Sequence, residues 1–173
     1  MPRFARPRMG LALGVLGAWL SSAGPALAFE RQWHFGGGLG AAAPNGGYSL
    51  GPVLGLHAAY GISDVFDARL ELQGSTHDLD GLAVSFYGAK AGLAYKLDVI
   101  QWIPYAGVSA GEYAIVWNEG TLFRPCVGAL VGLDYAFSRH FGMGVVGSGD
   151  YVFSDPQVTV FSGLFRAEYR FGW

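Results

Sequence analysis

The chain ends in FSGLFRAEYRFGW, residues 161–173, and this stretch decides the fold. Aromatic and charged residues alternate along it, so that one face is apolar and the opposite face carries charge. A period of two is the signature of a β-strand with two unlike faces. The apolar face carries Phe161, Phe165, Ala167, Tyr169, Phe171 and Trp173, with Gly163, and the other carries Ser162, Leu164, Arg166, Glu168 and Arg170.

The same alternation recurs upstream, where apolar residues at every second position face charged or small ones. Together with the last stretch it predicts eight strands, near residues 33–42, 53–60, 66–74, 85–97, 103–113, 125–137, 141–151 and 161–173. Eight strands of this length suit a small transmembrane barrel. The connections after the second, fourth and sixth strands are short turns. We expect the connections after the first, third, fifth and seventh strands to have about seven to eleven residues. We therefore predict an all-β protein, an eight-stranded antiparallel up-and-down transmembrane β-barrel with both ends of the chain on the periplasmic side.

Composition excludes several classes of protein. Glycine supplies 28 of the 173 residues, aromatic residues make up 15% and charged residues only 14%. Disordered chains have the opposite balance. The formal charge of −2 gives no basic surface for nucleic acid. A single cysteine cannot form a disulfide within the chain.

The first 28 residues have the pattern of a secretory signal peptide. Arg3, Arg6 and Arg8 precede an apolar run over 9–20, and Ala26-Leu27-Ala28 follows a helix-breaking segment. The run is shorter than the roughly 20 residues of a spanning helix. We expect residues 1–28 to be removed and 29–173 to form the barrel domain, with eight basic and 13 acidic residues.

Periodicity alone does not tell which face points inward. A secreted barrel of the lipocalin type is apolar inside, whereas a membrane barrel is apolar outside. The polar faces consist largely of glycine and alanine with isolated charges, which suits a narrow lumen and not a soluble surface. Aromatic residues also gather near strand ends, as membrane interfaces require. They are Tyr60, Phe66, Tyr95, Tyr105, Tyr135, Phe137, Phe141, Tyr151, Phe171 and Trp173.

Two motifs resemble those of a known superfamily. The C-terminal stretch, with Phe165, Tyr169, Phe171 and Trp173, resembles the signature recognised by the barrel assembly machinery of Gram-negative bacteria. The stretch WIPYAGVSAG, residues 102–111, resembles a strand of small barrels of the OmpA, OmpX and OmpW type, with Ser109 where glycine is usual. The resemblance implies a bacterial outer-membrane protein. It also implies contact with outer-membrane lipid, lipopolysaccharide and the assembly machinery, and it implies no cofactor or particular activity.

The lumen is the place where charged side chains would gather. Five are basic and five acidic, and such a balanced set favours a structural ion-pair network that plugs the barrel over a conducting pore. Arg69 and Glu71 are placed to meet Lys90. Glu112 lies on a strand too poorly phased to assign. The ten inward charges are Asp67, Arg69, Glu71, Lys90, Lys96, Asp134, Asp150, Arg166, Glu168 and Arg170.

Ser75, His77 and Asp78 follow the third predicted strand, at the outer rim. Enzymes that edit lipid A keep a catalytic serine and histidine in such a place, and Ser148 and Asp150 reach the same rim. A nucleophilic serine needs a histidine within hydrogen-bond reach and a third group that orients it. Closeness in sequence does not establish that geometry, and a polar loop tip rich in turn-forming residues is the favoured interpretation, so we expect no enzyme here.

His34 and His57 are expected to fill the lumen without binding metal, and Cys126 to be a small lumen filler. We expect an apolar cluster in the 113–123 loop to extend the lipid-facing belt, and the alternatives are that it contacts a hydrophobic ligand or an envelope protein. We expect a structural or interaction role. The alternatives are an OmpW-like passage for small hydrophobic molecules, which requires an apolar inner groove, and a lipid A acyl hydrolase or transferase. The apolar cluster comprises Tyr113, Ile115, Val116, Trp117, Leu122 and Phe123.

Overall fold

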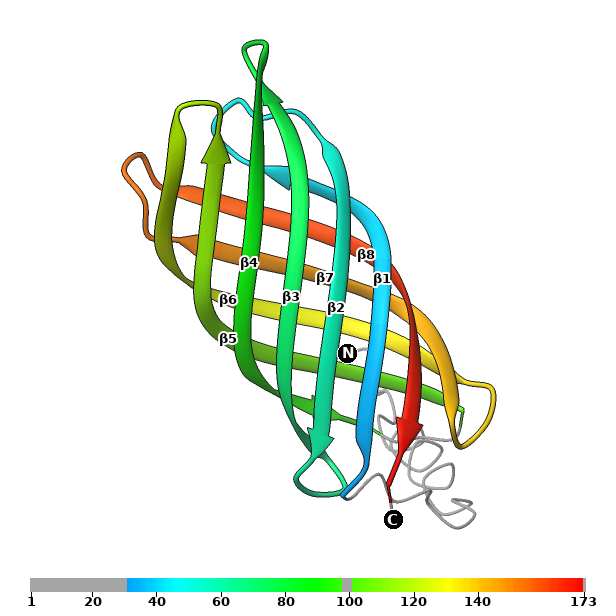
Figure 1. The fold of residues 1–173 in the computed structure, drawn as a ribbon. Coiled ribbons are helices and arrows are strands. Elements are labelled where there is room, and N and C mark those ends of the chain that lie inside the picture. The colour runs from blue at the N-terminus through cyan, green and yellow to red at the C-terminus, as the bar shows by residue number, and fades with distance from the viewer. Residues whose placement is uncertain (1–30, 98–100, 173) are drawn as a thin grey trace, which may run out of the picture.

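The computed structural model describes residues 31–97 and 101–172, and these form a closed barrel (Figure 1). Each strand pairs antiparallel with its neighbours in sequence, and β1 pairs with β8 from Trp33↔Phe171 onward, which closes the sheet. The expected all-β, eight-stranded up-and-down barrel is confirmed. Its strands are β1 Trp33–Pro44, β2 Gly51–Gly61, β3 Phe66–Leu79, β4 Leu82–Lys96, β5 Trp102–Trp117, β6 Gly120–Ala136, β7 Phe141–Val152 and β8 Val158–Phe171.

Two parts of the sequence prediction lie outside the described residues. These are the signal peptide, residues 1–28, and the terminal Trp173. Within the described part of the chain, no helix is long and apolar enough to cross a membrane.

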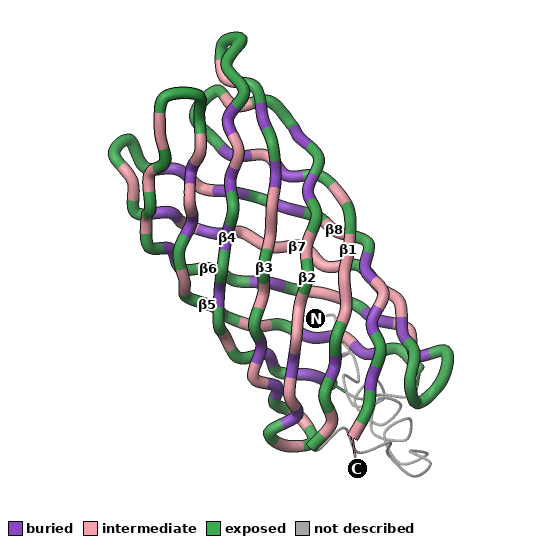
Figure 2. The backbone as a smooth tube through the Cα atoms, viewed as in Figure 1, coloured by how far each residue is buried: buried purple, intermediate pink, exposed green. Residues whose placement is uncertain are grey.

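Burial alternates clearly along strands such as β4 and β8, as the period of two predicts, whereas β1 and β7 have half-buried residues in their middle (Figure 2). The outward positions carry large apolar side chains such as Leu39, Leu54 and Val108, each about two thirds exposed. Such a wall is suited to lipid and would be unstable in water.

A belt of aromatic pairs surrounds the end at which β1 begins and β8 ends, which we call the terminal end. Neighbouring strands contribute Trp33 and Tyr60 with ring centroids 4.9 Å apart, and Trp102 and Tyr135 at the same separation. Phe66 and Tyr95 form a third pair, at 5.4 Å. Aromatic belts of this kind mark the level of a membrane interface.

The connections at the opposite end, which we call the far end, are shorter than expected. β3 runs to Leu79 and β4 begins at Leu82, so only Asp80 and Gly81 join them. Both residues have positive φ, 52° and 85°, as the tight turn of a two-residue hairpin requires. β5 and β6 are likewise joined by two residues, 118–119. The expected seven to eleven residues were therefore wrong, because pairing continues into those segments and lengthens the strands.

Candidate functional site: the barrel interior

All ten predicted lumen charges point into the barrel, and most lie toward its terminal end. Nine of them are buried, and the side chain of Glu71 is 17% exposed. Lys96 Nζ lies 2.7 Å from Asp67 Oδ1, and Arg166 Nε donates to Asp134 Oδ1 at 3.0 Å. Buried charges are tolerated only when opposite charges and hydrogen bonds accompany them.

Glu168, on β8, is the most connected member of this group. Arg170 Nε donates to its Oε1 at 2.6 Å, and His57 Nε2 lies 3.1 Å from its Oε2. His34 Nδ1 and an Arg166 nitrogen complete the surroundings at 3.4 and 3.7 Å. One carboxylate therefore joins strands β1, β2 and β8 through the lumen.

Asp150 occupies the border between the charged region and the far end. Lys90 Nζ lies 2.6 Å from its Oδ2, and the Tyr113 hydroxyl donates to the same oxygen at 2.8 Å. Lys90 also lies 3.7 Å from Glu71, whose other oxygen is 3.5 Å from Arg69 Nε. These contacts connect β3, β4, β5 and β7 across the lumen.

Tyr105 lies in the lumen and not in the aromatic belt, which corrects its predicted position. It is 5% exposed, and its ring lies 4.5 Å from the Arg166 guanidinium carbon and 5.0 Å from that of Arg69. Cation–π contacts on a desolvated ring stabilise both cations. The alternation of β5 alone could not show this, because small residues occupy both its faces.

The far half of the lumen is apolar, whereas the sequence indicated inward faces of glycine and alanine with isolated charges. Phe86 and Tyr113 are fully buried at its centre, with ring centroids 6.3 Å apart. Tyr113 and Ile115 were expected on the exposed 113–123 loop, but they face inward because β5 extends to Trp117. Cys126 also packs here, as a small filler. The cluster comprises Ala42, Val53, Val84, Phe86, Tyr113, Ile115, Cys126, Val152, Val158 and Val160.

The connection between β1 and β2 closes this apolar half. Tyr48 packs its ring edge-on against Phe86 at 5.3 Å, and burial raises the pKa of the Tyr48 hydroxyl. Ser49 is tied to β3 three times. Its amide donates to the Asp78 carbonyl at 2.8 Å, its hydroxyl accepts from the Asp78 amide at 2.8 Å, and its carbonyl lies 2.9 Å from His77 Nδ1.

Ser75 and His77 touch, but not in a loop. Both lie on β3 and face inward, with His77 Nε2 2.9 Å from the Ser75 hydroxyl, and both are less than 5% exposed. Asp78 points outward and accepts from the Gly81 amide, so it does not orient His77. Ser148 is bonded to Ser162 instead. The position that a catalytic acid would fill is occupied by the Ser49 carbonyl.

Glycines on the lumen side explain how large side chains fit inside a narrow barrel. A Cβ at Gly132 would overlap the Tyr105 ring and hydroxyl, and one at Gly144 would overlap Asp134. At Gly88 it would lie 2.9 Å from the Tyr113 ring. Two of the spaces between these side chains are small, about 10 Å³ among the charged residues and about 50 Å³ beside His57 and Arg69. Among the described residues, no cluster of His, Cys, Asp and Glu is arranged to hold a metal ion.

Comparison with protein-family models and with curated proteins finds no match to this sequence. Solved structures do match. Neisserial surface protein A aligns with 83% of this chain and 96% of its own at 16% identity, with a TM-score of 0.64. OprG from Pseudomonas aeruginosa aligns over 83% and 97% at 14% identity, with a TM-score of 0.61. Ail of Yersinia pestis, in complex with the heparin analogue sucrose octasulfate, aligns over 82% and 99% at 16% identity, with a TM-score of 0.60. The chain therefore has the fold of the small eight-stranded outer-membrane β-barrels.

Proposed function

We propose that this protein is an integral outer-membrane barrel with a structural or interaction role and a lumen that does not conduct ions. The observation that supports the proposal is that two different sets of side chains fill the interior. Paired charges occupy the terminal half and packed apolar side chains the far half. An eight-stranded barrel has an interior just wide enough for such filling.

Two features support a location in the outer membrane, the apolar outer wall of the barrel and the aromatic residues of β8 near the end of the chain. Large apolar side chains cover the wall, and Phe165, Tyr169 and Phe171 project outward from β8, each about half exposed. These outward aromatic residues belong to the C-terminal signature that the assembly machinery would bind. With residues 1–28 as an export signal, the terminal end would lie in the periplasm, and outer-membrane lipid and lipopolysaccharide would surround the wall.

Two measurements test this proposal. The outer-membrane fraction is run in SDS with and without boiling, and the purified protein is added to a planar bilayer. We expect unboiled protein to migrate differently from boiled protein, since a closed barrel resists SDS until it is heated. We expect no stepwise conductance. A soluble protein without the shift would contradict the membrane location, and steady single-channel steps would contradict the filled lumen.

A passage for small hydrophobic molecules is the second candidate, because the apolar inner region that it requires exists in the far half. The side chains of that region pack against one another, with Phe86, Val152 and Val160 fully buried. A passage would require the β1–β2 connection and Tyr48 to move aside. The filled arrangement therefore favours the structural role.

A lipid A acyl hydrolase or transferase is the third candidate, and its requirement that Ser75 and His77 touch is met. Both side chains are less than 5% exposed, so an acyl carbonyl could reach the serine hydroxyl only if neighbouring groups moved aside. We expect Ser75→Ala to leave the lipid A of the producing strain unchanged. The measurement is mass spectrometry of lipid A from strains with wild-type protein, Ser75→Ala and no protein. A change in acyl chain number that requires both wild-type protein and Ser75 would establish the enzyme.

A further inference from the structure

Glu112 is placed on the lipid-facing wall of the barrel. It lies on β5, is exposed, and pairs in register with Ala89 on β4 and Pro125 on β6. Among the outward positions of the eight described strands, only Asp78 and Glu112 are charged, and Asp78 sits beside a hairpin turn. The Glu112 carboxylate has no hydrogen-bond or ion-pair partner within the described residues.

The depth of Glu112 follows from the strand geometry. It is ten residues beyond Trp102, which lies in the aromatic belt of the terminal end. Ten residues at about 3.3 Å each, on a strand tilted by about 40°, rise about 25 Å along the barrel axis. The apolar band of such barrels is about 25 Å tall. Glu112 therefore lies at the far edge of that band, at the level of lipid headgroups.

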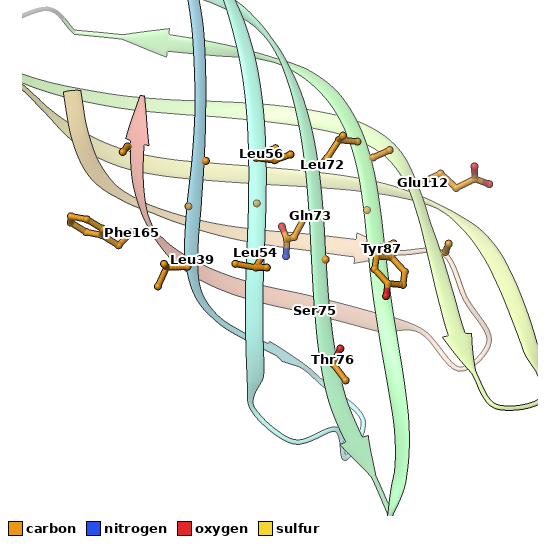
Figure 3. A pocket seen from close by; sticks show the side chains of 18 of the residues that line it. Leu39, Leu54, Leu56, Leu72, Gln73, Ser75, Thr76, Tyr87, Glu112 and Phe165 are labelled. Atoms are coloured by element: carbon orange, nitrogen blue, oxygen red, sulfur yellow. The ribbon is translucent and has the colours of Figure 1, made fainter. Parts of the chain in front are cut away.

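Glu112 stands at one edge of a hollow in this wall (Figure 3). Gly74, Ala89 and Ala114 form a floor of small residues, while Tyr87 and Phe123 stand beside it. Tyr87 and Phe123 both pair in register with Ala114, which is two residues from Glu112 on the same face. Cross-strand diagonal neighbours of this kind lie about 7–8 Å apart. The hollow extends over β1 to β3 along leucines, and its volume is about 1140 Å³.

We propose that this hollow binds a membrane lipid whose headgroup carries a primary amine. A lone carboxylate only accepts hydrogen bonds and matches a single ammonium group in charge. Tyr87 and Phe123 line the same hollow, and an aromatic ring attracts a cation that comes within about 6 Å of its centre. The leucine-lined extension of the hollow takes an acyl chain. The proposal rests on the membrane location proposed above.

The test measures which lipids stay on the barrel. Full-length protein is inserted into nanodiscs that contain equal amounts of phosphatidylethanolamine, phosphatidylcholine and phosphatidylglycerol, and bound lipids are identified by native mass spectrometry. Wild-type protein is expected to retain phosphatidylethanolamine about threefold over either other lipid, an effect typical of one exposed cation contact. A second set of nanodiscs compares lipid A with and without a phosphoethanolamine substituent, because that substituent offers the same amine.

Glu112→Gln is the decisive variant, since it keeps the shape and removes the charge. It is expected to abolish the preference in both sets. Asp78→Asn is the matched control, because it removes the other outward charge, and it is expected to keep the preference. Equal retention of all lipids by wild-type protein, or a preference that survives Glu112→Gln, overturns the proposal. The SDS migration of each variant is measured in parallel. If wild-type protein migrated in SDS in the same way with and without boiling, the proposed membrane barrel would be overturned instead.

Discussion

Replacing Glu168 by alanine is expected to destabilise the barrel by about 3–5 kcal/mol, the range found when one partner of a buried ion pair is removed. Arg170 and His57 bond directly to this carboxylate, and His34 and Arg166 lie within 4 Å of it. The substitution leaves five basic residues against four acidic ones in the lumen. Because Glu168 and Arg170 are almost fully buried, solvent screens the excess positive charge only weakly.

The measurement is urea unfolding of the barrel in lipid vesicles, followed by tryptophan fluorescence and by the fraction that migrates as folded protein in SDS. Glu168→Gln is expected to be milder, because it keeps the volume and the hydrogen-bond acceptor. Glu119→Ala is the control, since Glu119 lies exposed in the β5–β6 turn, where such a change typically stays within about 0.5 kcal/mol. If Glu168→Ala cost no more than Glu119→Ala, the lumen charges would contribute nothing to stability.

Periodicity predicted the strands, and the glycine- and alanine-rich composition of the polar faces predicted which face of most strands points inward. In lipid the wall has to be apolar, so every strand that alternates reveals its inward side. Arg69 and Glu71 on β3, and Arg166 and Glu168 on β8, could therefore be assigned to the lumen from the sequence. A period of two also fixes strand pairing, since a slip of one residue would turn these charges toward lipid.

The same reasoning fails where both faces of a strand are alike. On β5, alanine, glycine and serine alternate with one another, so neither Tyr105 nor Glu112 could be phased. At the far end both faces carry apolar residues, and Phe86 and Tyr113 on the inner face cannot be told from membrane-belt aromatics. The division of the lumen into a charged and an apolar half is therefore visible only once the strands are in register.

The hairpins at the far end were predicted wrongly for a different reason. Asp80-Gly81 is a strong two-residue turn signal, and it lies in the sequence between two alternating segments. Polar residues before it suggested a loop instead. Ser75 and His77 alternate in phase with Glu71 and Gln73, and following that phase would have placed both inside the barrel on β3.

Replacing Gly132 by alanine is expected to destabilise the barrel by about 1–3 kcal/mol, although the change adds a single methyl group. The added Cβ would overlap the ring and hydroxyl of Tyr105. That ring cannot simply turn away, because it is buried between the guanidinium groups of Arg166 and Arg69. Displacing it disturbs both cations and their carboxylate partners. The measurement is the urea midpoint in lipid vesicles.

Gly163→Ala is the matched control, because Gly163 faces outward and a Cβ there would meet no heavy atom within 4 Å. Since glycine within a strand is unfavourable by roughly 0.5–1 kcal/mol relative to alanine, this variant is expected to be neutral or slightly more stable. Tyr105→Ala removes the ring that a Cβ at Gly132 would overlap. In its background, Gly132→Ala is expected to cost at least about 1 kcal/mol less than in the wild type, as coupled neighbours do. If Gly132→Ala destabilised the wild-type and the Tyr105→Ala protein equally, Gly132 would not be needed to make room for the Tyr105 ring.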